Sequence, residues 1–257
     1  MSILVEGRTI GLLVLLVMAF LLWYFMNQAT KGKVESVRRL PVMDAMEEAV
    51  GRSVEMGRPV LATYSYPDNL TPAILVGLEM VGYVSKIATE KGAEMLIPVG
   101  GGRTFPIAVE NYRVGCIEAG RPELFKEENV KFLTHQQWAY GSGVMGLMER
   151  ENPGACIFMG PFLVEGIHFG VQTQRIKTVG IGGVERYDMG AFMFITMNYT
   201  ILGSELFAAG AYMSEDPVII SGIATEDVLK WIIGILVILG SILKATGIEV
   251  LMNLFRL

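Results

Sequence analysis

Apolar residues are concentrated near both ends of the chain. Residues 10–26 (IGLLVLLVMAFLLWYFM) are 17 consecutive positions without a charge, which matches the shortest helices that cross a bilayer. Residues 231–243 (WIIGILVILGSIL) are also uncharged, and the apolar pattern continues to residue 252 with Lys244 and Glu249 as interruptions. We therefore predict a transmembrane helix near each end, with these two charges reaching the membrane surface or a partner helix.

Each predicted span has an alternative. The first could be a secretory signal peptide, but residues 27–30 (NQAT) contain one alanine and not a small-residue cleavage pattern. We therefore expect an uncleaved anchor. The second could be a buried core helix, since its uncharged run has only 13 residues. We favour a span because Glu226, Asp227 and Lys230 precede it as at a membrane boundary.

Between these segments, short apolar runs alternate with helical patterns. The runs are apolar throughout, which indicates a sheet buried on both faces, and intervening helices indicate parallel crossovers. We predict an α/β fold, a doubly wound and mostly parallel sheet of about five strands. The strand-like runs are residues 59–66, 94–99, 130–133, 155–159 and 191–197, with a weaker one at 178–181. The helical patterns are residues 41–56, 71–91, 105–119, 134–151, 161–173 and from 198 to about 213.

Proline, glycine and threonine mark several helix ends. Pro41 and the Thr71-Pro72 pair are expected at helix starts, and Gly57 and Gly92 at helix ends. Thr134 is expected to cap the helix that follows it.

The predicted organisation is an N-terminal anchor at 1–30, an α/β domain at 31–227 and a C-terminal transmembrane helix at 228–257. A transporter with four spans is the alternative, because residues 154–173 and 190–213 are long enough to cross a membrane. Their polar residues make such spans costly.

Basic residues predict the orientation in the cell membrane. Lys31, Lys33, Arg38 and Arg39 follow the first span, whereas Arg8 alone precedes it and Arg256 alone follows the second. The positive-inside rule therefore places the central domain in the cytoplasm and both termini outside. Cys116 and Cys156 are then expected to stay reduced.

The composition narrows the function classes. Hydrophobic residues make up 52% and charged residues 18%, against about 25% charged in ordinary soluble domains. The net charge is −5 without a basic patch, so nucleic acid is not an expected partner. The 30 glycines and 16 methionines exceed what a sheet and two spans require, which favours an assembling protein.

A glycine-rich turn is the main candidate binding site. Gly100, Gly101, Gly102, Arg103 and Thr104 follow a predicted strand and precede a helix, where backbone N–H groups can bind an anion. Arg103 could add a bidentate contact to phosphate or carboxylate. The turn lacks the Walker A lysine and the dinucleotide fingerprint, so a purely structural turn remains an alternative.

Other turns are expected at the same edge of the sheet, where ligands bind in open α/β folds. Their candidate binding residues are Asp68, Asn69 and Asn198.

No catalytic constellation is found. Glu165 and His168 have the i, i+3 spacing of di-iron bundles, but one such pair favours a satisfied buried pair over a metal site. Ser142 lacks a nucleophile elbow. We predict no metal site and no catalytic residue, and the sequence leaves enzyme activity and any cofactor undecided.

Two helical segments are rich in small residues. Residues 137–148 (QWAYGSGVMGLM) and 203–213 (GSELFAAGAYM) indicate tight helix packing, inside the domain or between subunits.

Two stretches of the chain resemble a known family. Residues 132–148 and 203–217 resemble a family of membrane-anchored prokaryotic proteins of unknown function, and this resemblance implies no functional residue.

The expected function is a membrane-anchored cytoplasmic scaffold or accessory subunit. Its expected partners are the lipid bilayer and further copies of itself or subunits of a larger membrane complex. The alternative is a sensor or enzyme that binds a nucleotide or other anionic small molecule at residues 100–104.

Overall fold

The computed structural model describes residues 9–31, 40–214 and 216–245. The strands are β1 (Val60–Thr63), β2 (Met95–Val99), β3 (Val130–Phe132), β4 (Ala155–Gly160), β5 (Val179–Val184) and β6 (Tyr199–Leu202). The α-helices are α1 (Thr9–Ala29), α2 (Pro41–Glu55), α3 (Pro72–Lys91), α4 (Phe105–Glu118), α5 (Gln137–Glu151), α6 (Val164–Arg175), α7 (Tyr187–Thr196), α8 (Ser204–Ser214) and α9 (Pro217–Ala245). Two 3₁₀ turns, Pro122–Leu124 and Glu127–Asn129, precede β3.

All six strands pair in parallel in the order β3-β2-β1-β4-β5-β6. In the register, Val60 of β1 lies opposite Met95 of β2 on one side and Ala155 of β4 on the other. The chain builds outward from β1 to β3, then returns to the centre with β4. The strand order therefore reverses between β1 and β4, the place where open α/β sheets bind ligands.

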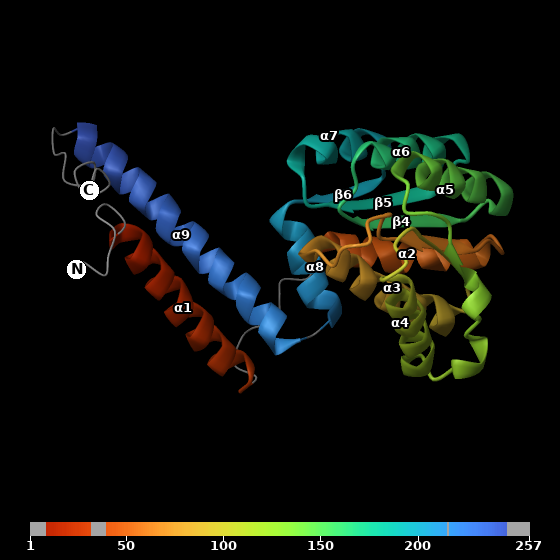
Figure 1. Ribbon diagram of the computed structural model, residues 1–257, viewed down its shortest axis with the longest axis horizontal. Helices are drawn as coiled ribbons and strands as arrows, with labels where there is room; N and C mark the ends of the chain where they lie inside the picture. The colour runs from red at the N-terminus through yellow and green to blue at the C-terminus, as the bar shows by residue number, and fades with distance from the viewer. Residues whose placement is uncertain (1–8, 32–39, 215, 246–257) are drawn as a thin grey trace. The chain divides into compact units, whose positions relative to one another are not determined.

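Helices cover both faces of this sheet. Figure 1 shows α5, α6 and α7 on one face and α2, α3, α4 and α8 on the other. Successive strand residues point to opposite faces, so Val60 and Ala62 join the core beneath α3 while Leu61 joins the core beneath α5 and α6. The predicted α/β fold with a parallel sheet is confirmed.

Most of the residues predicted to begin or end a helix do so in the structure. Pro41 and Pro72 begin α2 and α3, and the Thr71 hydroxyl accepts a hydrogen bond from the Ile74 N–H at 3.3 Å. Gly92 ends α3 in the left-handed conformation, with φ of 79°, which glycine adopts without a Cβ clash.

The expectation for Thr134 is wrong. Gln136 is the residue that precedes α5, and the Thr134 hydroxyl accepts from the Gln136 N–H instead of capping the helix.

The region around residue 195 also differs from the prediction. The apolar pattern predicts a strand at residues 191–197, but these residues lie largely in α7, and the strand is β6, which follows. An apolar run of seven residues has no periodicity that separates a strand from a helix. Conversely, β6 is an edge strand with exposed Tyr199, so it lacks the continuous apolar pattern of a central strand.

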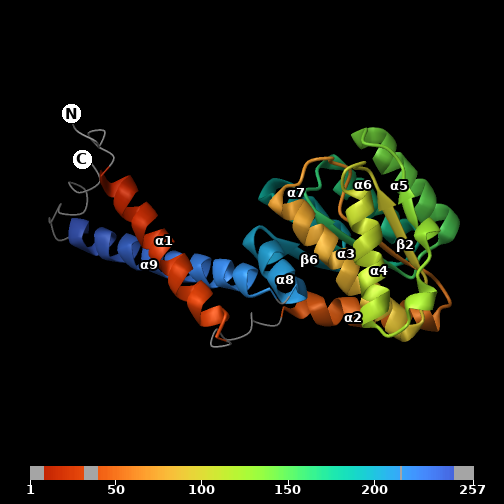
Figure 2. The ribbon, with the colours of Figure 1, turned by 60° about the horizontal axis from the view of Figure 1, so that its bottom comes forward.

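The helices α1 and α9 belong to one compact unit, and α2 to α8 belong to another. Within the first unit, α1 and α9 lie against each other and run in opposite directions, as both ribbon views show (Figures 1 and 2). Residues 11–29 and 217–245 are long and apolar enough to cross a membrane. The charges at Arg8, Lys33, Arg38, Arg39, Glu249 and Arg256 lie outside the described residues.

Three further segments bear on the number of spans. Pro72–Lys91 also has the length and hydropathy of a span, but 67% of it is buried inside the α/β domain. Residues 154–173 comprise β4 and most of α6, and residues 190–213 comprise parts of α7 and α8 with β6 between them. Neither of these last two stretches forms one continuous helix.

Candidate functional site

The glycine-rich turn packs closely against the loop that follows β1. A Cβ at Gly100 would lie 2.4 Å from Tyr66 Cα, and one at Gly101 would lie 2.6 Å from the Pro67 carbonyl oxygen. At Gly102 no atom lies within 4 Å of such a Cβ. The first two glycines therefore allow two loops to touch, while the third faces open space.

The Asp68 carboxylate already contacts the N–H groups of Arg103 that an anion would need at this turn. The Arg103 backbone N–H donates to Asp68 Oδ1 at 2.6 Å, and Arg103 Nε lies 3.5 Å from Asp68 Oδ2. The Arg103 side chain is 80% exposed. A bound phosphate would have to compete with this carboxylate for the same N–H.

Thr104 lies beneath the turn. Its side chain is buried, its hydroxyl donates to the Gly101 carbonyl at 3.1 Å, and it accepts from the Tyr64 hydroxyl at 3.0 Å. Burial raises the pKa of Tyr64, so this phenol stays protonated and remains a donor. These contacts give Thr104 a packing role.

The structure separates the two candidate asparagines. Asn69 is exposed in the loop after β1, on the predicted edge. Asn198 precedes β6, and its Oδ1 accepts from the Gly180 N–H at 2.9 Å near the start of β5. The expectation that Asn198 lies at the carboxyl edge is wrong, because it depended on a strand at 191–197.

A buried polar cluster occupies the point where the strand order reverses. Glu165, in the first turn of α6, is 2% exposed. Its Oε1 accepts from the Ser65 hydroxyl at 3.2 Å and from the Leu163 N–H at 3.0 Å, and its Oε2 accepts from Gln137 Nε2 at 2.6 Å. Three neutral donors from α5, the β1–α3 loop and the start of α6 thus converge on one carboxylate.

Ser65 has an unusual backbone conformation at this place. Its φ is +93°, and it is fully buried. A non-glycine residue in this region costs on the order of 1–3 kcal/mol and concentrates at functional sites. The conformation lets Ser65, two residues after β1, direct its hydroxyl toward Glu165.

Buried hydroxyls lie between this cluster and the sheet, since the Ser65 N–H donates to the Thr63 hydroxyl at 3.5 Å. Tyr140 of α5 donates to the Pro98 carbonyl at 3.1 Å, and the Thr63 hydroxyl donates to the same oxygen at 2.7 Å. Burial, followed by the negative charge of Glu165, raises the pKa of Tyr66. On the side of the sheet that faces α5, the Glu165 carboxylate thus lies among neutral hydrogen-bond donors.

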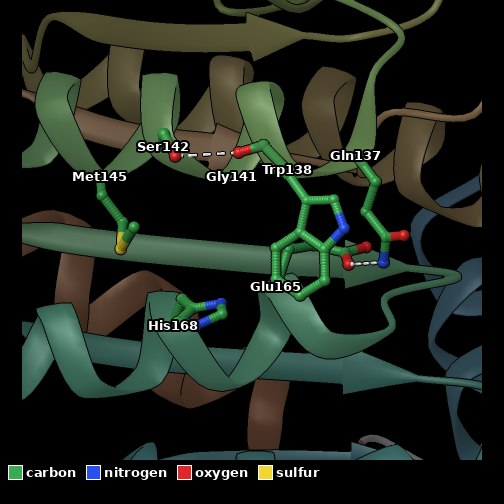
Figure 3. A pocket seen from close by; sticks show the side chains of 7 residues that line it. All are labelled: Gln137, Trp138, Gly141, Ser142, Met145, Glu165 and His168. Carbon is green, nitrogen blue, oxygen red and sulfur yellow. Dashed lines mark hydrogen bonds between the residues drawn. The ribbon is translucent and has the colours of Figure 1, made fainter.

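A cleft of about 110 Å³ adjoins Glu165 between α5 and α6. Figure 3 shows Trp138 extending from α5 toward α6, where Glu165 and His168 lie. The Trp138 and His168 rings are 6.1 Å apart in an edge-to-face arrangement. Among the described residues, no group of three or more potential metal ligands occurs.

The sequence drew attention to Glu165 and His168 only as a spacing motif. It did not indicate Ser65, Gln137 or Trp138, which come from separate elements and meet Glu165 only through the fold. Ser65 lies near the carboxyl end of the apolar run at 59–66, and this position was the one local signal that could have found it.

Both cysteines are buried, free thiols. Burial raises the pKa of Cys156, which removes the reactive thiolate at neutral pH. We expect N-ethylmaleimide to label each cysteine of the folded protein at least ~100-fold more slowly than it labels an exposed thiol. Mass spectrometry checks this by counting adducts before and after urea denaturation, with Leu75→Cys, at a position that is 50% exposed on α3, as a positive control. Rapid native labelling of Cys156 would contradict the burial described above.

Comparison with known protein families gives a match over nearly the whole chain. No curated protein and no solved structure matches the chain significantly. A model described as a domain of unknown function, DUF6754, matches residues 1–255. The resemblance to an uncharacterised family is thereby supported, and the chain belongs to the DUF6754 family.

Proposed function

We propose that this protein is a membrane-anchored scaffold or accessory subunit whose α/β domain associates with a second copy through α7. The apolar helices α1 and α9 support the anchor, since both have the length and hydropathy of spans. The basic residues after the first span support a cytoplasmic domain with both termini outside. Self-association is supported by the surface of α7.

The observation that carries the proposal is that α7 is largely apolar on its exposed side as well as on its buried side, with Asp188 in its first turn as the one charged residue. Gly190 and Met193 are buried against the domain, whereas Tyr187, Phe194 and Ile195 are 67%, 69% and 74% exposed. A helix that is hydrophobic all round is normally buried on all sides. We therefore expect the exposed side of α7 to contact a partner.

A second copy of the chain fits this surface better than a charged partner. Aromatic residues and methionine are enriched at the centre of interfaces, and charges are depleted there. The exposed side of α7 follows that composition, with Asp188 as its one charged residue. Asp188 is also neutralised by Arg186, with which it forms an ion pair.

The anchors compensate for a small interface. A helix of 10 residues covers less than the ~800 Å² per partner of a standard interface. Two copies confined to one bilayer meet at a high effective concentration, so a weak contact suffices. The edge strand β6 lies next to α7 in the domain, and its exposed Tyr199 extends the available surface.

Cysteine crosslinking of the full chain in its membrane tests this proposal. In a two-fold contact the same patch meets itself, so Ala191→Cys on the exposed side of α7 is expected to form dimers with a short bis-maleimide. The native cysteines are buried and give little background. Adding Phe194→Glu is expected to reduce the dimer yield at least about tenfold, because it buries an unpaired charge.

Leu75→Cys provides the matched control. Leu75 is 50% exposed on α3, on the opposite face of the sheet. Equal crosslinking at Leu75→Cys and Ala191→Cys would count against a specific α7 contact. Crosslinking of Ala191→Cys only to a different protein would point to an accessory subunit of a larger complex instead.

The alternative of nucleotide or anion binding at residues 100–104 has weaker support. Arg103 is exposed and Gly102 faces open space, but the Asp68 carboxylate already accepts the hydrogen bond of the Arg103 backbone N–H.

A further inference from the structure

Glu165 is a buried carboxylate without a cation. Among the described parts of the chain, no lysine, arginine or histidine nitrogen lies within 4.0 Å of its oxygens as an ion pair. A buried charge is costly unless it is paired or well hydrogen-bonded. Here the three donors to the Glu165 carboxylate are neutral groups, so none of them brings a positive charge to it.

The hydrogen bonds leave one oxygen with free capacity. An ionised carboxylate has about four acceptor positions. Oε1 already accepts from Ser65 and from the backbone at Leu163, whereas Oε2 accepts only from Gln137. Oε2 can therefore take a further donor.

The cleft beside Glu165 supplies the other walls. Its lining includes the Trp138 indole, the Met145 thioether and the His168 ring. Trp138 is 65% exposed although it is a large aromatic residue. Indole faces attract cations, most strongly among the aromatic side chains. Negative charge at the base and an aromatic wall together favour a positively charged group.

Size limits the ligand. The volume of about 110 Å³ is smaller than the ~150 Å³ of an engineered cavity that holds benzene. A dinucleotide does not fit inside, whereas the head of an organic cation does. The single carboxylate and single imidazole also make a poor metal site, since metal ions in proteins take at least three or four such ligands.

We propose that the cleft between α5 and α6 binds the ammonium or guanidinium head of a small organic cation. In this complex Glu165 Oε2 accepts a hydrogen bond from the cation, and Trp138 forms the aromatic wall. The strained Ser65 and the Gln137 amide hold the carboxylate in place, so they act as positioning residues. The site lies where the strand order reverses and is independent of the α7 surface.

The test uses the full chain in phosphatidylcholine nanodiscs and two probes of the same shape. Methylguanidinium carries the charge, and N-methylurea is its neutral counterpart. Saturation-transfer NMR titrations are expected to show at least about tenfold tighter binding of methylguanidinium. Glu165→Gln keeps the side-chain size and is expected to abolish that preference, while Glu149→Gln, an exposed change on α5, retains it.

A second variant keeps the proposal testable if Glu165→Gln does not fold. Trp138→Leu alters an exposed side chain and is expected to lower the preference for methylguanidinium by about threefold. The proposal is overturned if the wild-type protein binds both probes equally, or binds neither saturably. It is also overturned if a folded Glu165→Gln keeps the preference, or if Trp138→Leu leaves the preference unchanged.

Discussion

Replacement of Gly77 by alanine is expected to destabilise the α/β domain by about 3 kcal/mol, the upper part of the usual range for overpacking. Gly77 lies in α3, where the helix crosses the ends of β1 and β4. An added Cβ would lie 2.3 Å from Tyr64 Cβ and 2.4 Å from the Met159 carbonyl oxygen. Because both obstacles belong to central strands or their immediate ends, a side-chain rotation does not relieve the clash.

Urea denaturation of the full chain in detergent micelles, followed by far-UV circular dichroism, measures this effect. The urea concentration at the unfolding midpoint is expected to fall by roughly 1–3 M, given the dependence of unfolding free energy on urea that is usual for small domains. Gly146→Ala in α5 is the matched control, since no atom lies within 4 Å of its added Cβ. Its expected effect has the opposite sign, a gain of about 0.5–1 kcal/mol from the lower helix propensity of glycine. A neutral Gly77→Ala would mean that α3 does not contact the strands this closely.

Part of the glycine surplus is explained by such contacts inside the domain. A Cβ at Gly115 of α4 would lie 2.6 Å from the Gly82 carbonyl oxygen of α3, and one at Gly210 of α8 would lie 2.7 Å from Val76 of α3. Two helices, α4 and α8, therefore pack on α3 through glycine contacts. The small residues at 203–213 serve internal packing at Gly210, one of the two alternatives that the sequence left open.

Local signals predicted the central elements well. Pro72 and Gly92 bound α3 because one fixes φ and the other permits a left-handed residue. The wholly buried runs of β1, β2 and β4 identified the parallel sheet because both of its faces are covered. These signals act within a few residues and need no knowledge of the fold.

Prediction failed where the fold itself decides the outcome. The run at 191–197 is apolar on all sides, so it carried no helical period, and misplacing it moved Asn198 to the wrong edge of the sheet. The Glu165 cluster joins α5, α6 and the loop after β1, with 100 positions between Glu165 and Ser65. A single sequence contains no signal for such long-range pairs.

Replacement of Phe169 by alanine is expected to cost about 3–5 kcal/mol, the range for deleting a buried phenylalanine ring. Phe169 is fully buried in α6, and its ring stacks on Phe158 at 5.1 Å. Phe162 and Tyr140 contact it edge-to-face at 6.0 and 6.3 Å. The variant therefore loses both the burial of the ring and aromatic contacts worth about 0.5–1.5 kcal/mol each.

The same urea titration measures this loss, and two variants separate its causes. Phe169→Leu keeps most of the volume and is expected to cost about 1–2 kcal/mol, mainly from the lost aromatic contacts. Val171→Ala on the same helix changes a side chain that is 45% exposed and is expected to stay within about 0.5 kcal/mol. Because Phe169 and Glu165 lie one turn apart on α6, the alanine variant is also expected to loosen the wall of the Glu165 cleft. A Phe169→Ala protein as stable as the wild type would show that α6 does not pack on β4 through this ring, and the position of Glu165 would then lack its support.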